Sequence, residues 1–336
     1  MTVFLGSLPP PYGGIASHLR DLSRVRPITV YDCQNKVGMA VNWSWGFFRA
    51  WLWILIHYES KRFIYHLAYL ALHAPDKISA YHVEPEGVLG YLYKRFIDPK
   101  CKLIITVFGE LHTSSKPYFK EVLDSADLLM ASSKYCASGV VKHGVEKPVT
   151  VIPYGVDIQH FQPAKKQGKY ILFVGHIHER MGLDTLLKAA YDLPVVVAGT
   201  DMGYLKTLQA NLPSKWRIVL NPSYENLPKL YQGAMMLVHP ANTAAPCMGL
   251  SLKEAMACGI PVIASDAGGI PEAIRNGLEG LVFKVNDSDE LRERIRELVA
   301  DPRARDYMGM DAHDRAERLY DRDKTSVSVL EAIDNV

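Results

Sequence analysis

The segment 249–272 constrains the fold more tightly than any other part of the chain. Its sequence, GLSLKEAMACGIPVIASDAGGIPE, predicts a glycine turn, a short helix with one acidic residue, a glycine stop, a buried apolar strand and a second glycine turn leading into another helix. This order is typical of an αβα unit in a parallel sheet. The two glycine-rich turns are therefore expected to line one crevice at the carboxyl ends of strands.

Apolar runs that predict strands alternate with helical patterns along both halves of the chain. The predicted strands lie at 3–6, 28–31, 78–82, 103–107, 128–131 and 149–152 in the first half, and at 170–175, 195–199, 216–220, 235–239, 261–265 and 280–283 in the second. Such alternation indicates βαβ units and the α/β class. Because a chain of 336 residues is longer than one hydrophobic core usually supports, we expect two Rossmann-like domains.

Proline and glycine interrupt the regular pattern midway, in the sequence IPYGVD at 152–157, and a lysine-rich stretch follows at 164–169. These features predict a domain junction followed by an exposed linker. We place an N-terminal domain at 1–154 and a C-terminal domain at 155–320. Within the second domain, amphipathic helices are predicted at 288–300 and 302–320.

Composition narrows the class of protein. A formal net charge of +2 argues against a protein built mainly to bind nucleic acid. The five cysteines are scattered, with no C-x-x-C pair, which is typical of reduced thiols in a cytoplasmic protein. No signal peptide is recognisable, and the most apolar segment, 47–57, is too short to span a bilayer and contains Arg49. We therefore expect a cytoplasmic protein without a spanning helix.

The segment 249–272 closely resembles the donor-sugar site of retaining glycosyltransferases of family 4, within the glycosyl transferases group 1, which have the GT-B fold. The junction 152–157 resembles the same family. The resemblance is strong over 149–300, moderate at 9–19 and faint at 34–72. It implies two Rossmann-like domains whose parallel sheets face each other across a cleft, and a last helix, at 321–336, that crosses back to the N-terminal domain.

The resemblance implies an enzyme that moves a hexose from a nucleotide diphosphate sugar, such as a UDP-sugar, to an acceptor hydroxyl with retention of anomeric configuration. In the front-face route proposed for the family, the leaving phosphate oxygen takes the acceptor proton. The protein then mainly positions the reactants and stabilises charge on the diphosphate. Neither a metal ion nor another cofactor is needed on this account, and the acceptor is a glycan, a lipid-linked sugar or a small molecule.

Two groups of residues are expected to bind the donor. By resemblance, Glu254 is the second acid of an E-x7-E motif and bonds the ribose hydroxyls, beside the amides of Met248, Gly249, Leu250 and Ser251. Near the start of the chain, Gly13 and Gly14 follow the first predicted strand and open a helix. Glycine lets the backbone approach an anion, and a helix amino terminus supplies free amides, so this loop is expected to contact the diphosphate or the sugar. The alternative is a plain tight turn.

The loop after the first strand of the second domain, FVGHIHERMG at 173–182, is the expected phosphate clamp. The family usually carries Arg after Gly175 and Lys before the next glycine, where this chain has His176 and Met181. Arg180 is the best remaining cation, and its guanidinium suits two phosphate oxygens, while His176 or His178 would add a donor if protonated. The alternative is a solvated surface arginine. A metal site at His176 and His178 is disfavoured, because no third ligand is near in sequence.

Two more positions depart from the family pattern. The first acid of E-x7-E falls on Pro246, and the histidine that often follows the fourth strand is Phe108. Glu110 and His112 come next in that loop and are candidates for catalytic contact in the cleft, with exposed loop residues as the alternative.

The acceptor is expected to contact His82 and Glu84, because they follow a predicted strand whose carboxyl end faces the ligand crevice. A capping or core-edge histidine is the alternative. The aromatic segment 43–53 also has two interpretations. It is either a helix in the core of the first domain or a face that touches the acceptor or, peripherally, the inner side of a membrane.

The departures leave a second function open. A catalytically silent GT-B protein that binds a nucleotide sugar or a protein partner would tolerate the loss of the usual residues at Phe108, His176, Met181 and Pro246. An epimerase or phosphorylase on the same fold also remains open, because fold alone does not fix activity. The intact 249–272 segment favours the transferase.

Overall fold

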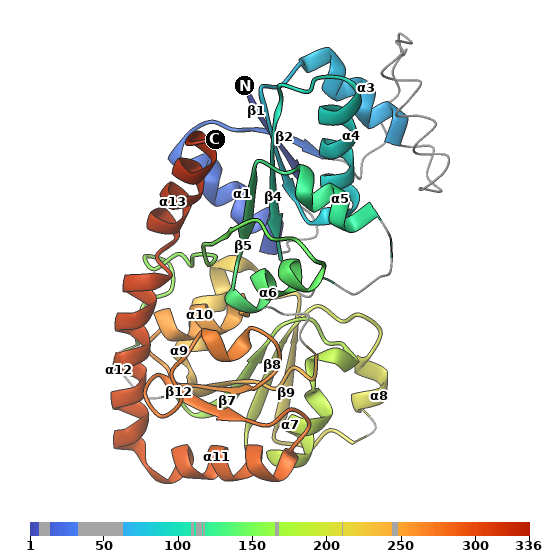
Figure 1. Ribbon diagram of the computed structural model, residues 1–336. Helices are drawn as coiled ribbons and strands as arrows, with labels where there is room; N and C mark the ends of the chain where they lie inside the picture. The colour runs from blue at the N-terminus through green and yellow to red at the C-terminus, as the bar shows by residue number, and fades with distance from the viewer. Residues whose placement is uncertain are drawn as a thin grey trace. The chain divides into compact units, whose positions relative to one another are not determined.

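The computed structural model describes residues 1–6, 14–32, 63–108, 111, 116, 118–164, 168–209, 211–243 and 248–336. They form two compact units (Figure 1), one of Met1–Ile152 with Ser326–Val336 and one of Pro153–Thr325. Each unit contains a six-stranded sheet in which every pair of neighbouring strands is parallel. This architecture confirms the predicted α/β class with two Rossmann-like sheets.

The N-terminal sheet has the strand order β2-β1-β3-β4-β5-β6. Its strands are β1 (Thr2–Gly6), β2 (Thr29–Asp32), β3 (Lys77–Tyr81), β4 (Lys102–Val107), β5 (Leu128–Ala131) and β6 (Val149–Val151). The helices described in this unit are α1 (Gly14–Val25), α3 (Phe63–His73), α4 (Val88–Phe96), α5 (Tyr118–Ser125) and α6 (Lys134–Lys142), together with most of the last helix, α13 (Arg322–Asp334).

Helices α1 and α13 pack on one face of this sheet, and α4 covers the other (Figure 1). Leu330 and Ile333 of α13 share a core with Phe4 of β1 and Leu22 of α1. On the other face, the α4 backbone at Gly90 lies so close to the sheet that a Cβ there would be 2.5 Å from Leu103. The carboxyl-terminal residues are therefore part of the N-terminal core.

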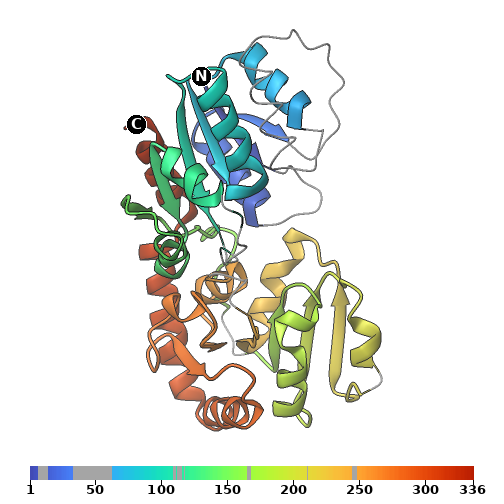
Figure 2. The same ribbon diagram turned by 45° about the vertical axis from the view of Figure 1, so that its right-hand side comes forward.

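The C-terminal sheet has the order β12-β11-β10-β7-β8-β9. Its strands are β7 (Tyr170–Val174), β8 (Val195–Gly199), β9 (Trp216–Leu220), β10 (Ala234–His239), β11 (Val262–Ser265) and β12 (Gly280–Phe283). The helices are α7 (Leu183–Ala189), α8 (Leu205–Gln209), α9 (Leu227–Gln232), α10 (Leu250–Ala257), α11 (Ser288–Ala300) and α12 (Pro302–Leu319). In Figure 2, α7 lies along the strands; with α11 it buries one side of the sheet, while α10 packs against β10, β11 and α12.

The structure confirms the predicted strands of both halves and both predicted helices at 288–320. The helix expected after the second glycine turn is wrong, because only a three-residue 3₁₀ turn, Ile270–Glu272, forms there. The connection turns back within a few residues at Gly277, and the buried Glu279 carboxylate binds the Arg275 backbone and guanidinium. The chain thus enters β12 before a longer helix can form.

Strand order fixes where a ligand is expected in each unit. In the C-terminal sheet, β7 is first in sequence and lies between β10 and β8, so the chain builds outward from it in both directions. The connections that follow β7 and β10 therefore lead to strands on opposite sides of this pair, and such a switch point is the usual ligand crevice of an open α/β sheet. In the N-terminal sheet, the corresponding pair is β1 and β3.

The loop after β7 is fixed to the loop after β10 by backbone contact. Gly182 has a φ of 67°, and a Cβ there would lie 1.8 Å from the Pro240 carbonyl oxygen. Asn242 donates from its backbone N–H to the Arg180 carbonyl and from its side-chain amide to the Glu179 carbonyl, each over 3.1 Å. The two loops that frame the switch point are thus held in one arrangement.

We predict that Gly182→Ala lowers the free energy of unfolding by about 3 kcal/mol, because it adds a backbone clash to the cost of a positive φ. Gly277→Ala is the matched control: Gly277 has a φ of 83°, but a Cβ added there would meet none of the described atoms within 4 Å. That control should lose only about 1 kcal/mol. Urea unfolding of both variants measures the difference, and equal losses would show that the Pro240 contact is unimportant.

Candidate functional site

The amino end of α10 lies beside the carboxyl end of β10. Gly249 caps the helix with φ 61° and ψ 114°, and no side-chain hydrogen bond caps it. A Cβ at Gly249 would lie 3.2 Å from Nε2 of His239, the last residue of β10. Met248 is buried, whereas Leu250 and Ser251 are partly exposed. The first-turn amides of a helix favour an anion, so this end of α10 suits a phosphate group.

Glu254, on the same helix, is a buried carboxylate with one oxygen left available. Its residue exposure is 6%. Oε2 accepts a 2.6 Å hydrogen bond from the Tyr231 hydroxyl, whereas no hydrogen bond from the described residues reaches Oε1. Burial raises the pKa of Glu254 to about 7, and the Tyr231 hydrogen bond opposes that rise. Buried acceptors normally have partners, so Oε1 is the atom that a ligand hydroxyl would satisfy.

His239 is a second buried polar group at this switch point. It is 2% exposed, and its Nδ1 has no hydrogen-bond partner among the described residues. Burial lowers the pKa of His239 to about 4, so the imidazole is neutral at physiological pH. Sequence reasoning missed His239, although the rule that strand ends face the crevice would have selected it. It also missed Tyr231, which no motif marks.

The β7 loop places its polar side chains at the surface. β7 ends at Val174, before His176, and the side chains of His176 and Arg180 are exposed. The Arg180 backbone N–H donates to His178 Nδ1 over 3.1 Å, but no described residue binds its guanidinium. Gly175 packs on Gly199, the last residue of β8: a Cβ at Gly199 would lie 1.7 Å from the Gly175 carbonyl oxygen. The loop is thus fixed through its backbone, with the predicted cation unengaged by the described residues.

The end of β7 at Val174 also decides whether the two histidines of this loop point to the same side. Because β7 stops before His176, alternation along a strand does not place His176 and His178 on one side. Within the described ranges, no group of three or more His, Cys, Asp or Glu side chains is placed to hold a metal ion.

In the N-terminal unit, His82 follows β3 at the switch point. Its backbone is held by hydrogen bonds to the Thr106 carbonyl (2.8 Å) and from the Gly87 N–H (3.2 Å), with φ 75° and ψ 163°. Its ring meets the Phe108 ring edge-on, with centroids 5.8 Å apart, and burial lowers its pKa. A non-glycine residue held at positive φ is uncommon and is often found at functional sites. His82 therefore offers a fixed, neutral imidazole at this edge.

Glu84, the other predicted acceptor residue, already has partners. Lys116 donates to both carboxylate oxygens, over 2.7 and 2.9 Å, and the Tyr118 hydroxyl donates over 3.1 Å. Any acceptor contact would compete with this ion pair, so acceptor binding by Glu84 stays a prediction.

Several predicted residues lie outside the described residues: Gly13, Glu110, His112, Pro246 and the aromatic segment 43–53. Gly14 begins α1. The roles proposed for all of them stay predictions. Across the part of the chain that the structure describes, no helix is both long and apolar enough to cross a membrane.

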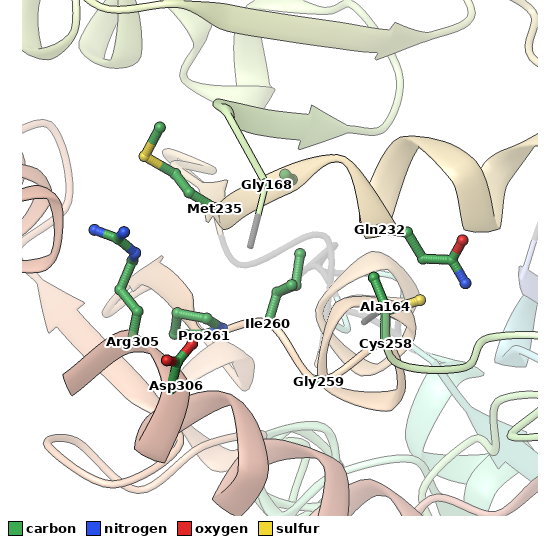
Figure 3. Close-up of a pocket in the computed structure, with 11 residues that line it drawn as sticks. Ala164, Gly168, Gln232, Met235, Cys258, Gly259, Ile260, Pro261, Arg305 and Asp306 are labelled. Atoms are coloured by element: carbon green, nitrogen blue, oxygen red, sulfur yellow. The ribbon is translucent and has the colours of Figure 1, made fainter. Parts of the chain in front are cut away.

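A cavity of about 210 Å³ lies at the opposite edge of the C-terminal sheet (Figure 3). Its lining includes Gly168 and Pro261, which precede β7 and β11, and Ala234, which begins β10. Arg305 and Asp306 of α12 close another side. Because these strand residues lie at amino ends, the cavity is separate from the switch point.

Comparison with known proteins shows what the C-terminal unit is similar to. Residues 156–315 match the family described as Glycosyl transferases group 1. A D-inositol 3-phosphate glycosyltransferase of Mycolicibacterium gilvum is 30% identical over 209 residues, which cover 54% of this chain and 47% of the relative. One from Mycobacterium tuberculosis is 29% identical over 214 residues, covering 55% of this chain and 44% of the relative. The match thus spans about half the length of these relatives.

Solved structures share the whole fold at low identity. HepE of Anabaena, solved in complex with UDP and glucose, aligns with a TM-score of 0.82 and 18% identity over 100% of this chain and 99% of its own. Sucrose-phosphate synthase of Thermosynechococcus elongatus aligns with a TM-score of 0.79 and 18% identity, covering 98% and 97% of the two chains. The chain therefore has the GT-B fold, and residues 156–315 of its C-terminal unit are similar to the glycosyl transferases group 1.

Proposed function

We propose that this protein transfers a hexose from a nucleoside diphosphate sugar to an acceptor hydroxyl with retention of anomeric configuration. One observation carries the proposal: the buried Glu254 has an oxygen unpartnered by the described residues, on the helix whose amino end lies at the switch point. A carboxylate oxygen suits a ribose hydroxyl, and helix amides suit a diphosphate. The relatives named as glycosyltransferases and the UDP-bound HepE structure support the same chemistry.

In this proposal four groups of the C-terminal unit bind the donor. Glu254 accepts from the ribose, and the amides of residues 248–251 face the diphosphate. Arg180, exposed and unengaged by described residues, supplies the positive charge of the β7 loop. His239 adds a neutral imidazole next to Gly249. Because both loops are fixed by backbone contacts, these groups need little rearrangement when charge develops on the leaving phosphate.

The proposed step breaks the bond from the sugar C1 to the phosphate oxygen and forms a bond from C1 to the acceptor oxygen. The acceptor proton passes to the leaving phosphate oxygen, so no protein nucleophile is required. Retention enters the proposal through the resemblance of residues 249–272 to retaining enzymes. On the acceptor side, His82 provides a neutral imidazole that can bond a hydroxyl.

The test is to incubate the full chain with UDP-glucose, UDP-galactose, UDP-N-acetylglucosamine and GDP-mannose, with a panel of glycan, lipid-linked and small acceptors. Released nucleoside diphosphate measures turnover, and NMR of the product gives the anomeric configuration. Release with an α-linked product from an α-linked donor supports the proposal. Tight nucleotide binding without release from any donor would instead support the catalytically silent binder.

We predict that Glu254→Gln has opposite effects on binding and stability. Glutamine has one side-chain oxygen, and the Tyr231 hydroxyl donates to it, so the NH2 group left facing the ribose does not accept and UDP binding should weaken about 30-fold. The pKa of Glu254 in the folded protein, about 7, lies above its ordinary value of 4.5. Between these two pH values the carboxyl group is protonated in the folded state and ionised in the unfolded state. Stability of the wild type therefore falls as the pH rises, and the uncharged variant should gain on the order of 2 kcal/mol relative to it by pH 8.5.

Calorimetry with UDP and urea unfolding at pH 5 and pH 8.5 measure both effects. Glu293→Gln, which changes an exposed carboxylate on α11, is the control and should alter neither. Unchanged UDP affinity in the Glu254 variant would remove this residue from the site, and parallel stability curves would show that its carboxyl group is not desolvated.

We predict that Arg180→Ala lowers turnover about 100-fold with a smaller effect on donor affinity, because its contact strengthens as charge builds on the leaving diphosphate. Lysine at this position should restore only part of the rate, since a point charge does not reproduce the planar guanidinium. Arg296→Ala, an exposed arginine of α11, should leave turnover unchanged. Wild-type rates in the Arg180 variant would dismiss it as a catalytic group.

A further inference from the structure

The hydroxyl of Tyr231 is the side-chain hydrogen-bond donor that the described structure gives to Glu254. Tyr231 lies on the short helix α9 and is fully buried, at 0% exposure. Its O–H lies 2.6 Å from Glu254 Oε2. Burial, and then the neighbouring carboxylate, raise the pKa of Tyr231 well above its ordinary value. The phenol therefore keeps its proton and acts as a permanent donor.

Helix α9 is anchored on both sides of Tyr231. The Tyr170 hydroxyl donates to the Leu230 carbonyl over 2.7 Å, and the Gln232 side chain donates to the Gln162 carbonyl over 2.9 Å. The Tyr231 ring also packs edge-on against Phe161, with centroids 5.7 Å apart. With its neighbours in the chain held in this way, the hydroxyl has a fixed position from which to hold a carboxylate.

We propose that Tyr231 is a positioning residue of the donor site: by holding Oε2 of Glu254, it presents Oε1 to the ribose hydroxyls of the nucleotide. The inference rests on the proposed function, because it assigns a role to Glu254 in donor binding. Tyr231 itself does not touch the donor. Tyr231 acts through Oε2 of Glu254. Holding Oε2 fixes the direction of Oε1, and a contact with the ribose requires that fixed direction.

The same hydrogen bond favours the charged carboxylate, which is the form that accepts from ribose. The other titratable and charged groups around α10 are held neutral by burial or bond backbone carbonyls. Burial raises the pKa of Cys258, which follows α10, and lowers that of His239 on β10. Lys253 bonds the Tyr154 carbonyl, and on α12 His313 bonds the Ala257 carbonyl while Arg305 bonds those of Leu298 and Val299. Removal of the Tyr231 hydroxyl therefore leaves Glu254 without its stabilising donor.

The affinity for a nucleotide should thus depend on pH, and the Tyr231 hydroxyl should set the midpoint of that dependence. Affinity should fall as the pH drops through about 7, because protonation of Glu254 removes the negative charge that strengthens its bonds to the ribose hydroxyls. In Tyr231→Phe, the charged form loses its hydrogen bond, so the midpoint of this fall should move to higher pH. At pH 7 the variant should bind UDP about tenfold more weakly than the wild type, and it should recover most of that loss at pH 8.5.

The experiment is calorimetric titration of UDP into the full chain from pH 5.5 to 8.5, for the wild type, Tyr231→Phe, Tyr204→Phe and Glu254→Gln. Tyr204→Phe is the matched control, because it removes a hydroxyl that donates to a different carboxylate, that of Asp184. We expect its midpoint to equal that of the wild type, and Glu254→Gln to bind weakly and to keep only the transition at about pH 6 that ionisation of the UDP terminal phosphate gives.

Each outcome separates the two proposals. An upward midpoint shift in Tyr231→Phe alone supports the positioning role. Equal shifts in both tyrosine variants, or none in either, would overturn that role while leaving nucleotide binding in place. If the wild type binds none of UDP, GDP and ADP, both the proposed function and the inference are overturned.

Discussion

The placement of β7 beside β10 at the carboxyl edge of the C-terminal sheet is the constraint on which the rest of the site depends. The chain leaves these strands in opposite directions, and this is the position where open α/β sheets usually bind a ligand. Close backbone contacts then fix the loops: Gly182 lies against Pro240, and Gly249 lies against His239. Glycine is required at both positions because each combines a positive φ with a near neighbour. The amides that face the crevice are therefore arranged before any ligand arrives.

Burial of Glu254 within this frame opposes stability, and in the proposed donor site it favours binding of the nucleotide. A desolvated carboxylate with one hydrogen bond is costly in the unliganded protein, and the raised pKa expresses that cost. A ligand hydroxyl at Oε1 would supply the missing partner, so part of the cost is recovered only when the nucleotide binds. Tyr231 lowers this cost by donating a hydrogen bond to Oε2, and it keeps the donated proton near neutral pH. Sites that bind or react commonly show this exchange of stability for activity.

The sequence predicted the strands and the 249–272 unit because period, length and glycine position are local properties. Contacts between distant segments were not predictable in this way. Tyr231 and Glu254 are 23 residues apart, and Lys116 engages Glu84 from 32 residues away. The helix expected after the second glycine turn failed because the buried Glu279 ion pair and the Gly277 turn shorten that connection.

The central claim is that the Glu254 carboxylate holds the ribose of a nucleoside diphosphate. The most direct measurement compares the affinity of the wild-type protein for UDP with its affinity for 2′,3′-dideoxyuridine diphosphate at pH 8, where the carboxylate is charged. The two ligands share base and diphosphate, so the difference reports the ribose hydroxyls alone. The account predicts that UDP binds at least about tenfold more tightly, because the dideoxy ligand leaves Oε1 without a partner. Equal affinities for the two ligands would contradict it.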